Sequence, residues 1–250
     1  MFLLIIFSLL GDVIALSFGV ALIFTKSRAQ RFARYATPFA AGALLAAAFA
    51  DLLPDAAAEG SINRGLTGAL VGILGFFLLE RFIHWFHHHR DDNAAAEDRD
   101  AAVPLIIVGN VLHRALDGVA IAAGFLSSPR LGLIVTTAII VHEIPHTVGD
   151  FGLLLHKKLS RRRVVLINVA VAIFTTVCAV IIYALGENVT LPLDALLGLT
   201  AGFFIYIAVS DIIPDIHVHE AKKFVGAQSV LLIVGAAVIA VLVELLRNLD

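Results

Sequence analysis

The sequence has 250 residues, of which 60% are hydrophobic and only 15% are charged, with a formal net charge of −2. Soluble domains carry about 25% charged residues, and a domain of this length cannot bury so much apolar surface in its own core. The composition excludes a disordered chain, a collagen-like fibre and an ordinary soluble enzyme. It predicts an integral membrane protein in contact with the lipid bilayer and argues against a nucleic-acid partner.

Eight apolar runs are each long enough to cross a bilayer as a helix, which needs about 20 residues. They are uniformly apolar rather than alternating, so they fit helices and not the strands of a β-barrel. They lie near residues 2–24, 36–56, 65–84, 103–126, 131–154, 164–185, 194–215 and 227–246. The sequence thus predicts one all-α transmembrane domain over residues 1–250, with a polar loop at 87–101.

Most lysines and arginines outside these runs lie in the loops that follow the first, third, fifth and seventh spans. The positive-inside rule places these loops, including 87–101, in the cytoplasm. Both termini are then expected outside, in a protein of the plasma (inner) membrane.

Two segments repeat at a constant offset of 160 residues. The first set is Ala41, Gly42, Asp51, Pro54 and Asp55, and the second is Ala201, Gly202, Asp211, Pro214 and Asp215. Spans 2 and 7 cross the membrane in opposite directions, so the pattern indicates an inverted 3+2+3 repeat, as in many transporters. The alternative is a chance similarity between two helices rich in alanine and glycine.

Spans 4 and 5 carry ionisable residues near their midpoints, where an unpartnered charge costs ~2.5–3.5 kcal/mol. They are His113, Arg114 and Asp117 in span 4, and His142, Glu143, His146 and Asp150 in span 5. His113 and Asp117 are spaced i,i+4, as are His142 and His146, so each pair shares a helix face. Three imidazoles and a carboxylate suit a tetrahedral Zn²⁺ site or a larger shell around another divalent metal. Asn110, one turn before His113, adds a possible amide oxygen.

Three alternatives to a transport site stay open at this point. The first is a hydrogen-bonded polar cluster that only locks two helices together. The second is an intramembrane zinc metalloprotease, because the segment from His142 to His146 reads H-E-x-x-H, in which Glu143 would be the general base. The third is a metal sensor that binds zinc without moving it.

The segments 113–121 (HRALDGVAI) and 142–150 (HEIPHTVGD) resemble the fourth- and fifth-span motifs of the ZIP family of divalent-metal transporters. The resemblance continues at Leu52-Leu53-Pro54-Asp55, at Glu80-Arg81 and at Asp211 with Pro214, and so covers nearly the whole chain. It implies an eight-span fold, often dimeric, that is not an enzyme and moves metal into the cytoplasm by alternating access. It implies Zn²⁺ first, with Fe²⁺, Mn²⁺, Cd²⁺ or Co²⁺ possible. It also implies a mid-membrane site at His113, Asp117, His142 and His146.

The sequence departs from the family pattern at Arg114, where asparagine is usual, at Thr147, where glutamate is frequent, and at Asp51, where many members have histidine. Many members hold a second metal beside the first, but a guanidinium cannot ligate a metal. We hypothesise that Arg114, paired with Asp117 or Glu143, replaces that second cation and leaves one metal site. The competing view is that Arg114 pairs with a carboxylate that would otherwise bind the metal, and also repels the metal. The protein would then be a weak or inactive transporter.

Acidic pairs are expected at both mouths of the pathway. Asp51 and Asp55 fall at the outer end of span 2, and Asp211 and Asp215 at the inner end of span 7. Carboxylates there can concentrate cations on entry and accept them on exit, although helix-end polarity would give the same pattern. Six cytoplasmic histidines can hold metal transiently or simply anchor the interface: His84, His87, His88, His89, His217 and His219.

Overall fold

The computed structural model describes residues 1–91, 99–156, 158–214 and 225–248. Within these ranges the description leaves out the side chains at 22, 26–34, 82–91, 99–102, 105–106, 153, 156, 211–212 and 225. Every regular element in the described ranges is a helix. Seven helical segments are long and apolar enough to span a membrane, and α5, which carries Arg114 and Asp117, is a further long helix. The prediction of an all-α membrane protein is confirmed.

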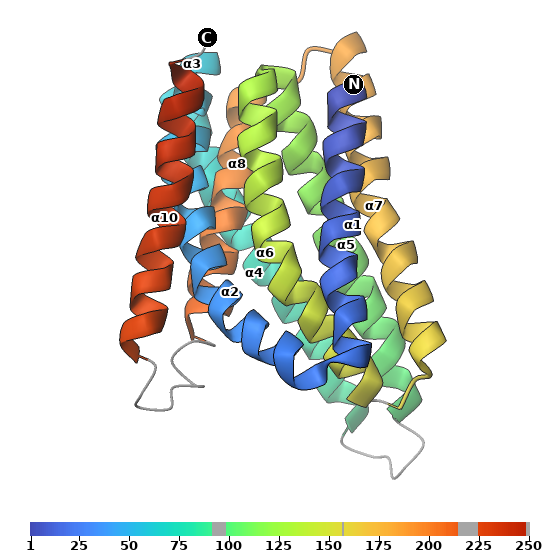
Figure 1. Cartoon of the computed structure of the whole chain (residues 1–250). Helices are drawn as coiled ribbons and strands as arrows, with labels where there is room; N and C mark the ends of the chain where they lie inside the picture. Colours follow the sequence, from blue (N-terminus) through green and yellow to red (C-terminus); the bar gives the residue numbers. More distant parts are fainter. Residues whose placement is uncertain (92–98, 157, 215–224, 249–250) are drawn as a thin grey trace.

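The long helices lie side by side across the molecule (Figure 1). They are α1 (Phe2–Phe24), α2 (Lys26–Ala47), α4 (Ile62–Asp91), α5 (Arg99–Ser127), α6 (Pro129–His156), α7 (Arg161–Asn188), α8 (Leu193–Tyr206) and α10 (Val225–Arg247). The π-helix η1 (Ala48–Leu52) and the short helix α3 (Leu53–Glu59) prolong α2, and the π-helix η2 (Ile207–Ile212) prolongs α8.

Several helices extend beyond the apolar runs from which they were predicted. α2 begins at Lys26 rather than near residue 36, and α4 and α5 enter the predicted polar loop 87–101 from both sides, at Asp91 and Arg99. A helix satisfies its backbone hydrogen bonds internally, so it can continue past the hydrocarbon boundary into polar sequence. Hydropathy alone therefore marks the part of each helix that lies in lipid and not the whole helix.

Both chain termini lie at the same end of the bundle, which is also the end where α3 lies (Figure 1). At this end α5 meets α6 and α7 leads into α8, whereas α1 meets α2 and α6 leads into α7 at the opposite end. An even number of crossings brings the two termini together in this way. We call this end the terminal end.

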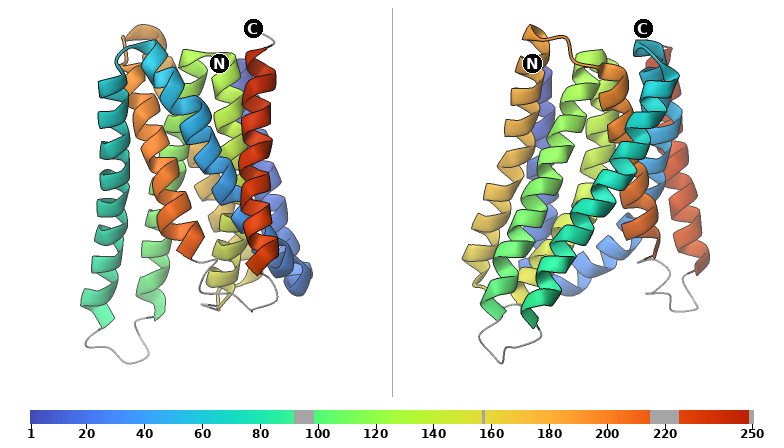
Figure 2. Two further views of the ribbon diagram at one scale, coloured as in Figure 1. Left: turned by 90° about the vertical axis from the view of Figure 1, so that its left-hand side faces the viewer. Right: turned by 180° about the vertical axis from the view of Figure 1, so that it is seen from behind.

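Glycines allow two pairs of helices to approach closely, α2 with α10 and α4 with α8 (Figure 2). A Cβ atom on Gly42 of α2 would overlap the carbonyl oxygen of Leu232 on α10, and one on Gly202 of α8 would overlap that of Ala69 on α4. Small residues at such crossings are typical of packing inside a membrane. Gly42 and Gly202 belong to the two predicted repeat segments, and the π-helices η1 and η2 occupy matching places in them. The inverted repeat itself stays a prediction.

The variant Gly202→Val is expected to destabilise the fold, because the valine side chain would have to push α4 and α8 apart. Overpacking of this kind costs about 1–3 kcal/mol, which thermal unfolding in detergent would detect as a lower Tm. The matched control is Gly75→Val on α4, where nothing lies within 4 Å of an added Cβ. Equal Tm values for the two variants would contradict the packing argument.

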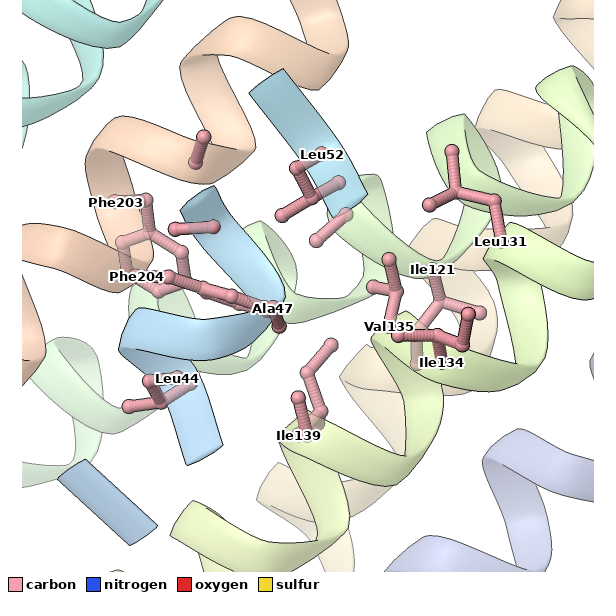
Figure 3. Close-up of a cluster of buried hydrophobic side chains, with 14 of the residues drawn as sticks. Leu44, Ala47, Leu52, Ile121, Leu131, Ile134, Val135, Ile139, Phe203 and Phe204 are labelled. Carbon is pink, nitrogen blue, oxygen red and sulfur yellow. The ribbon is translucent and has the colours of Figure 1, made fainter. Parts of the chain in front are cut away.

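The apolar core fills the space between α2, α5, α6 and α8 (Figure 3). Leu44, Ala47, Leu52, Ile121, Leu131, Ile134, Val135, Ile139, Phe203 and Phe204 are among its buried members. Two of its phenylalanines contact histidines: the ring centroids are 5.6 Å apart for Phe203 and His113, and 6.2 Å apart for Phe204 and His142. The core therefore forms one wall around the polar residues of α5 and α6.

Candidate metal centre

Four buried residues on two neighbouring helices bring their ligand atoms together. His113 and Asp117 lie one turn apart on α5, and His142 and Glu143 lie on α6. One ligand atom from each residue lies within 4.8 Å of the other three. We call these four residues the metal group. The i,i+4 spacing on α5 and the packing of α5 against α6 explain why they meet.

The separations in the metal group are close to those of a small coordination shell. The two histidine Nε2 atoms are 3.4 Å apart. Asp117 Oδ2 lies 3.7 Å from the Nε2 of His113, and Asp117 Oδ1 lies 3.7 Å from that of His142. Glu143 Oε2 is 4.0 Å from both nitrogens. Ligand atoms in a tetrahedral Zn²⁺ site with bonds of about 2.0–2.1 Å stand roughly 3.3–3.4 Å apart. The two histidines already stand at this spacing, whereas the carboxylate oxygens would have to move closer to the nitrogens to complete such a shell.

Three carboxylate oxygens in the metal group accept no hydrogen bond from any residue that the structure describes. They are both oxygens of Asp117 and Oε2 of Glu143. Ionised carboxylates buried without partners are strongly destabilising, whereas a divalent cation would satisfy all three oxygens. The donor set, imidazole nitrogen with carboxylate oxygen, fits Zn²⁺ and other first-row divalent ions.

His146, the third predicted imidazole, lies beside the metal group and not in it. Its ring stacks on that of His113, with centroids 4.6 Å apart and an interplanar angle of 27°. Its Nδ1 lies 3.6 Å from Asp150 Oδ2, which also accepts a hydrogen bond of 2.7 Å from the Asn110 side-chain nitrogen. Asn110, Asp150 and His146 thus form a polar border beside the metal group.

Arg114 is buried next to the metal group and forms ion pairs with carboxylates on two other helices. Its Nη2 lies 2.7 Å from Glu143 Oε1 and 3.1 Å from Thr147 Oγ1, and its Nη1 lies 3.2 Å from Asp12 Oδ1 on α1. Of the two expected partners, Glu143 and not Asp117 makes the contact. Asp12 is an acidic residue in the middle of the first span, and from the sequence it is expected to face the cavity or pair with a histidine. In the structure its partner is Arg114 instead.

The acidic pair expected at the outer mouth is held by two arginines at the terminal end. Arg130, in the first turn of α6, lies 2.7 Å from Asp51 and 2.6 Å from Asp55. Arg247, near the end of α10, lies 3.5 Å from Asp51 and 3.7 Å from Asp55. We call these four residues the arginine clamp. It ties η1 and α3 to α6 and α10.

The residues predicted for the inner mouth lie outside the described part of the structure. This applies to the side chains of Asp211, His84, His87, His88 and His89, and to the whole of Asp215, His217 and His219. Their roles in metal exit stay predictions.

Comparison with known proteins decides the family. The family model described as ZIP zinc transporter matches residues 1–104 and 89–243, which is most of the chain. The chain belongs to the ZIP zinc transporter family. Members of this family are transporters and not enzymes, so membership removes the metalloprotease interpretation of the H-E-x-x-H segment.

Individual ZIP proteins resemble the chain over different lengths. Zinc transporter ZIP13 of Mus musculus is 30% identical over 251 residues, which cover 83% of this chain and 68% of that protein. Zinc transporter ZIP4 of Homo sapiens is 39% identical over 111 residues, which cover 44% of this chain and 17% of that protein. Zinc transporter ZIP6 of Homo sapiens is 33% identical over 143 residues, or 54% of this chain and 18% of that protein. The chain thus spans about two thirds of the mouse relative and less than a fifth of the two human ones.

Proposed function

We propose that the chain moves a divalent metal ion, Zn²⁺ first, across the membrane toward the cytoplasm by alternating access, with the ion held at mid-membrane by His113, Asp117, His142 and Glu143. Family membership supports metal transport. The observation that carries the site is the buried metal group with its three unbonded carboxylate oxygens. Fe²⁺, Mn²⁺, Cd²⁺ and Co²⁺ can use the same donors.

A single ion per chain is the stoichiometry that the contacts favour. Arg114 lies against Glu143 Oε1, while Glu143 Oε2 faces the two histidines and has no hydrogen-bond partner. One carboxylate can thus bind the guanidinium with one oxygen and a metal with the other. Arg114 then occupies the place of a second cation without competing for the first.

The inverted repeat and the arginine clamp support an alternating-access cycle. The matched glycine crossings and matched π-helices fit a repeat in which spans 1–3 and spans 6–8 are related by symmetry. The clamp joins four elements at the terminal end, so it would close that end while an ion leaves on the other side. Under the positive-inside orientation the terminal end, with both chain termini, is the outer one, in the plasma (inner) membrane.

The outer faces of the bundle are apolar and exposed, for example at Leu66 on α4, Ile181 on α7 and Val241 on α10. Such faces fit contact with lipid. A homodimer, as the family resemblance implies, would bury part of this surface.

Zinc influx into proteoliposomes with a trapped fluorescent zinc indicator tests the proposal. We expect influx into vesicles that contain the protein and none into protein-free vesicles. Binding of zinc to the purified protein without influx would overturn transport in favour of a sensor. Absence of both binding and influx would overturn the metal site as well, in agreement with an inactive transporter.

Loss of one clamp residue should open the terminal end more often. Arg130→Gln removes the two shortest ion pairs of the clamp and leaves Arg247 as the one arginine of the clamp that faces Asp51 and Asp55. Even an exposed ion pair is worth up to about 1 kcal/mol, so we expect opening to rise on the order of tenfold for this more buried pair.

Cysteine labelling measures this opening. In a Cys178→Ala background, the buried Leu52 is replaced by cysteine, and the rate of reaction with an impermeant maleimide added at the terminal end is followed. The control is Arg64→Gln, which breaks an ion pair with Asp194 that joins α4 to α8. Equal labelling rates in the two variants would rule out the clamp as a gate.

A further inference from the structure

A buried carboxylate outside the metal group controls the charge that the group presents to an ion. Asp12 lies half-way along α1, is 6% exposed, and contacts Arg114 through Oδ1. Its Oδ2 accepts a hydrogen bond of 3.2 Å from Thr176 Oγ1 on α7, and the Thr176 hydroxyl is 2.7 Å from that of Ser8, one turn before Asp12 on α1. Asp12 is thus fixed in place by two helices that contribute nothing to the metal group.

Four buried ionisable side chains other than histidine lie in or against the metal group, and they give a simple charge count. Asp12, Asp117 and Glu143 carry three negative charges when ionised, and Arg114 carries one positive charge, so their net charge is −2 when the histidines are neutral. One divalent cation brings this cluster to zero. Charge left over in a low-dielectric interior is expensive, so the count favours one ion of charge +2.

Without Asp12 this balance fails in two ways. The cluster would carry only −1, so a bound divalent ion would leave an excess positive charge. The guanidinium of Arg114 would also lose the carboxylate that contacts its Nη1. Among the described residues, Glu143 would then be its only carboxylate partner at ion-pair distance. Both effects weaken the hold of Asp117 and Glu143 on the metal.

We propose that Asp12 is a positioning residue for metal binding: it balances the charge of Arg114, keeps one oxygen of Glu143 available to the ion, and thereby sets the site for a single divalent cation. This inference rests on the proposed function, since it concerns the same site. It adds a residue from the first span that lies outside the metal-binding motifs of spans 4 and 5.

Isothermal titration of the purified full-length protein with Zn²⁺ tests the inference through a charge-compensation cycle. We expect Asp12→Asn to weaken zinc binding roughly ten- to a hundredfold, a coupling of ordinary size between two neighbouring sites. The double variant Asp12→Asn with Arg114→Asn restores the net charge of −2 and should recover most of that loss. Asp12→Glu keeps the charge and should stay within a few-fold of the wild type.

A purely structural role for Asp12 gives a different pattern. Thr176→Val removes hydrogen bonds of the same cluster without a change of charge, and is the matched control. If Thr176→Val weakens binding as much as Asp12→Asn does, or if the double variant binds no better than Asp12→Asn, the charge-balancing role is wrong. Tm values in detergent show which variants are folded, and Asp12→Glu keeps the test informative if Asp12→Asn is not. Failure of the wild type to bind zinc would refute the proposed function itself, whereas normal binding by Asp12→Asn would refute only the role of Asp12.

Discussion

Replacement of His142 by alanine is expected to abolish zinc influx into proteoliposomes and to weaken zinc binding by more than about a hundredfold. Loss even of a residue that only supports a metal ligand costs 10–100-fold in affinity, and His142 Nε2 belongs to the metal group itself, within 3.4–4.0 Å of three other donor residues. The variant also removes the imidazole that lies 3.7 Å from Asp117 Oδ1. Titration calorimetry and the trapped-indicator assay measure the two effects.

His146→Ala is the comparison that makes this prediction specific. His146 lies on the same face of α6 one turn later, but its nearest charged contact is Asp150 and it is the more exposed histidine. We expect its loss to weaken binding by about tenfold or less, as for a residue that supports the ligands. If His146→Ala loses as much affinity as His142→Ala, His146 is a direct ligand and Glu143 is not required to complete four-fold coordination.

The second large effect concerns stoichiometry. Arg114→Asn is expected to raise the number of zinc ions bound per chain from one to two. Without the guanidinium, Asp12, Asp117 and Glu143 carry a net charge of −3, and Glu143 Oε1 and Asp12 Oδ1 lose their cationic partner. The new asparagine adds an amide oxygen that can serve as a ligand.

Metal analysis of the purified variant, together with calorimetry, counts the bound ions. The control is Arg64→Asn, which removes an arginine from a carboxylate far from the metal group, at Asp194. An unchanged number of ions bound with unchanged affinity would show that Arg114 does not stand in for a cation. Increased affinity with one ion still bound would favour the competing view, in which Arg114 merely repels the metal.

The sequence predicts the helices well because the bilayer imposes one simple requirement on length and hydropathy. It also predicts that His113 and Asp117 share a face of their helix, because this follows from the helical period alone. The same argument places His142 and His146 on one face, yet only His142 joins the metal group. The tilt and rotation of α6 against α5 decide between the two, and neither is encoded in the spacing.

It was harder to predict which buried charged residues pair with one another, because this too depends on the tilt and rotation of the helices. Arg114 lies three residues from Asp117 on one helix, and pairing between them was as plausible from the sequence as pairing with Glu143. The packing of α1 against α6 and α7 instead brings Asp12 to its other side. Likewise, nothing in the spacing of Asp51 and Asp55 indicates that Arg130 and Arg247 meet them, since those arginines come from distant helices.

The π-helix η1 has a mechanical consequence for the clamp. A π turn contains one more residue than an α turn, and each residue of an α-helix adds about 100° of rotation and 1.5 Å of rise. If η1 tightened into regular α-helix, everything beyond it would rotate and shift by about one residue. Asp55, which follows η1 in α3, would swing away from Arg130 although no helix had broken. A change of η1 from π-helix to α-helix would thus be enough to break the ion pair between Asp55 and Arg130 at the end of the helix.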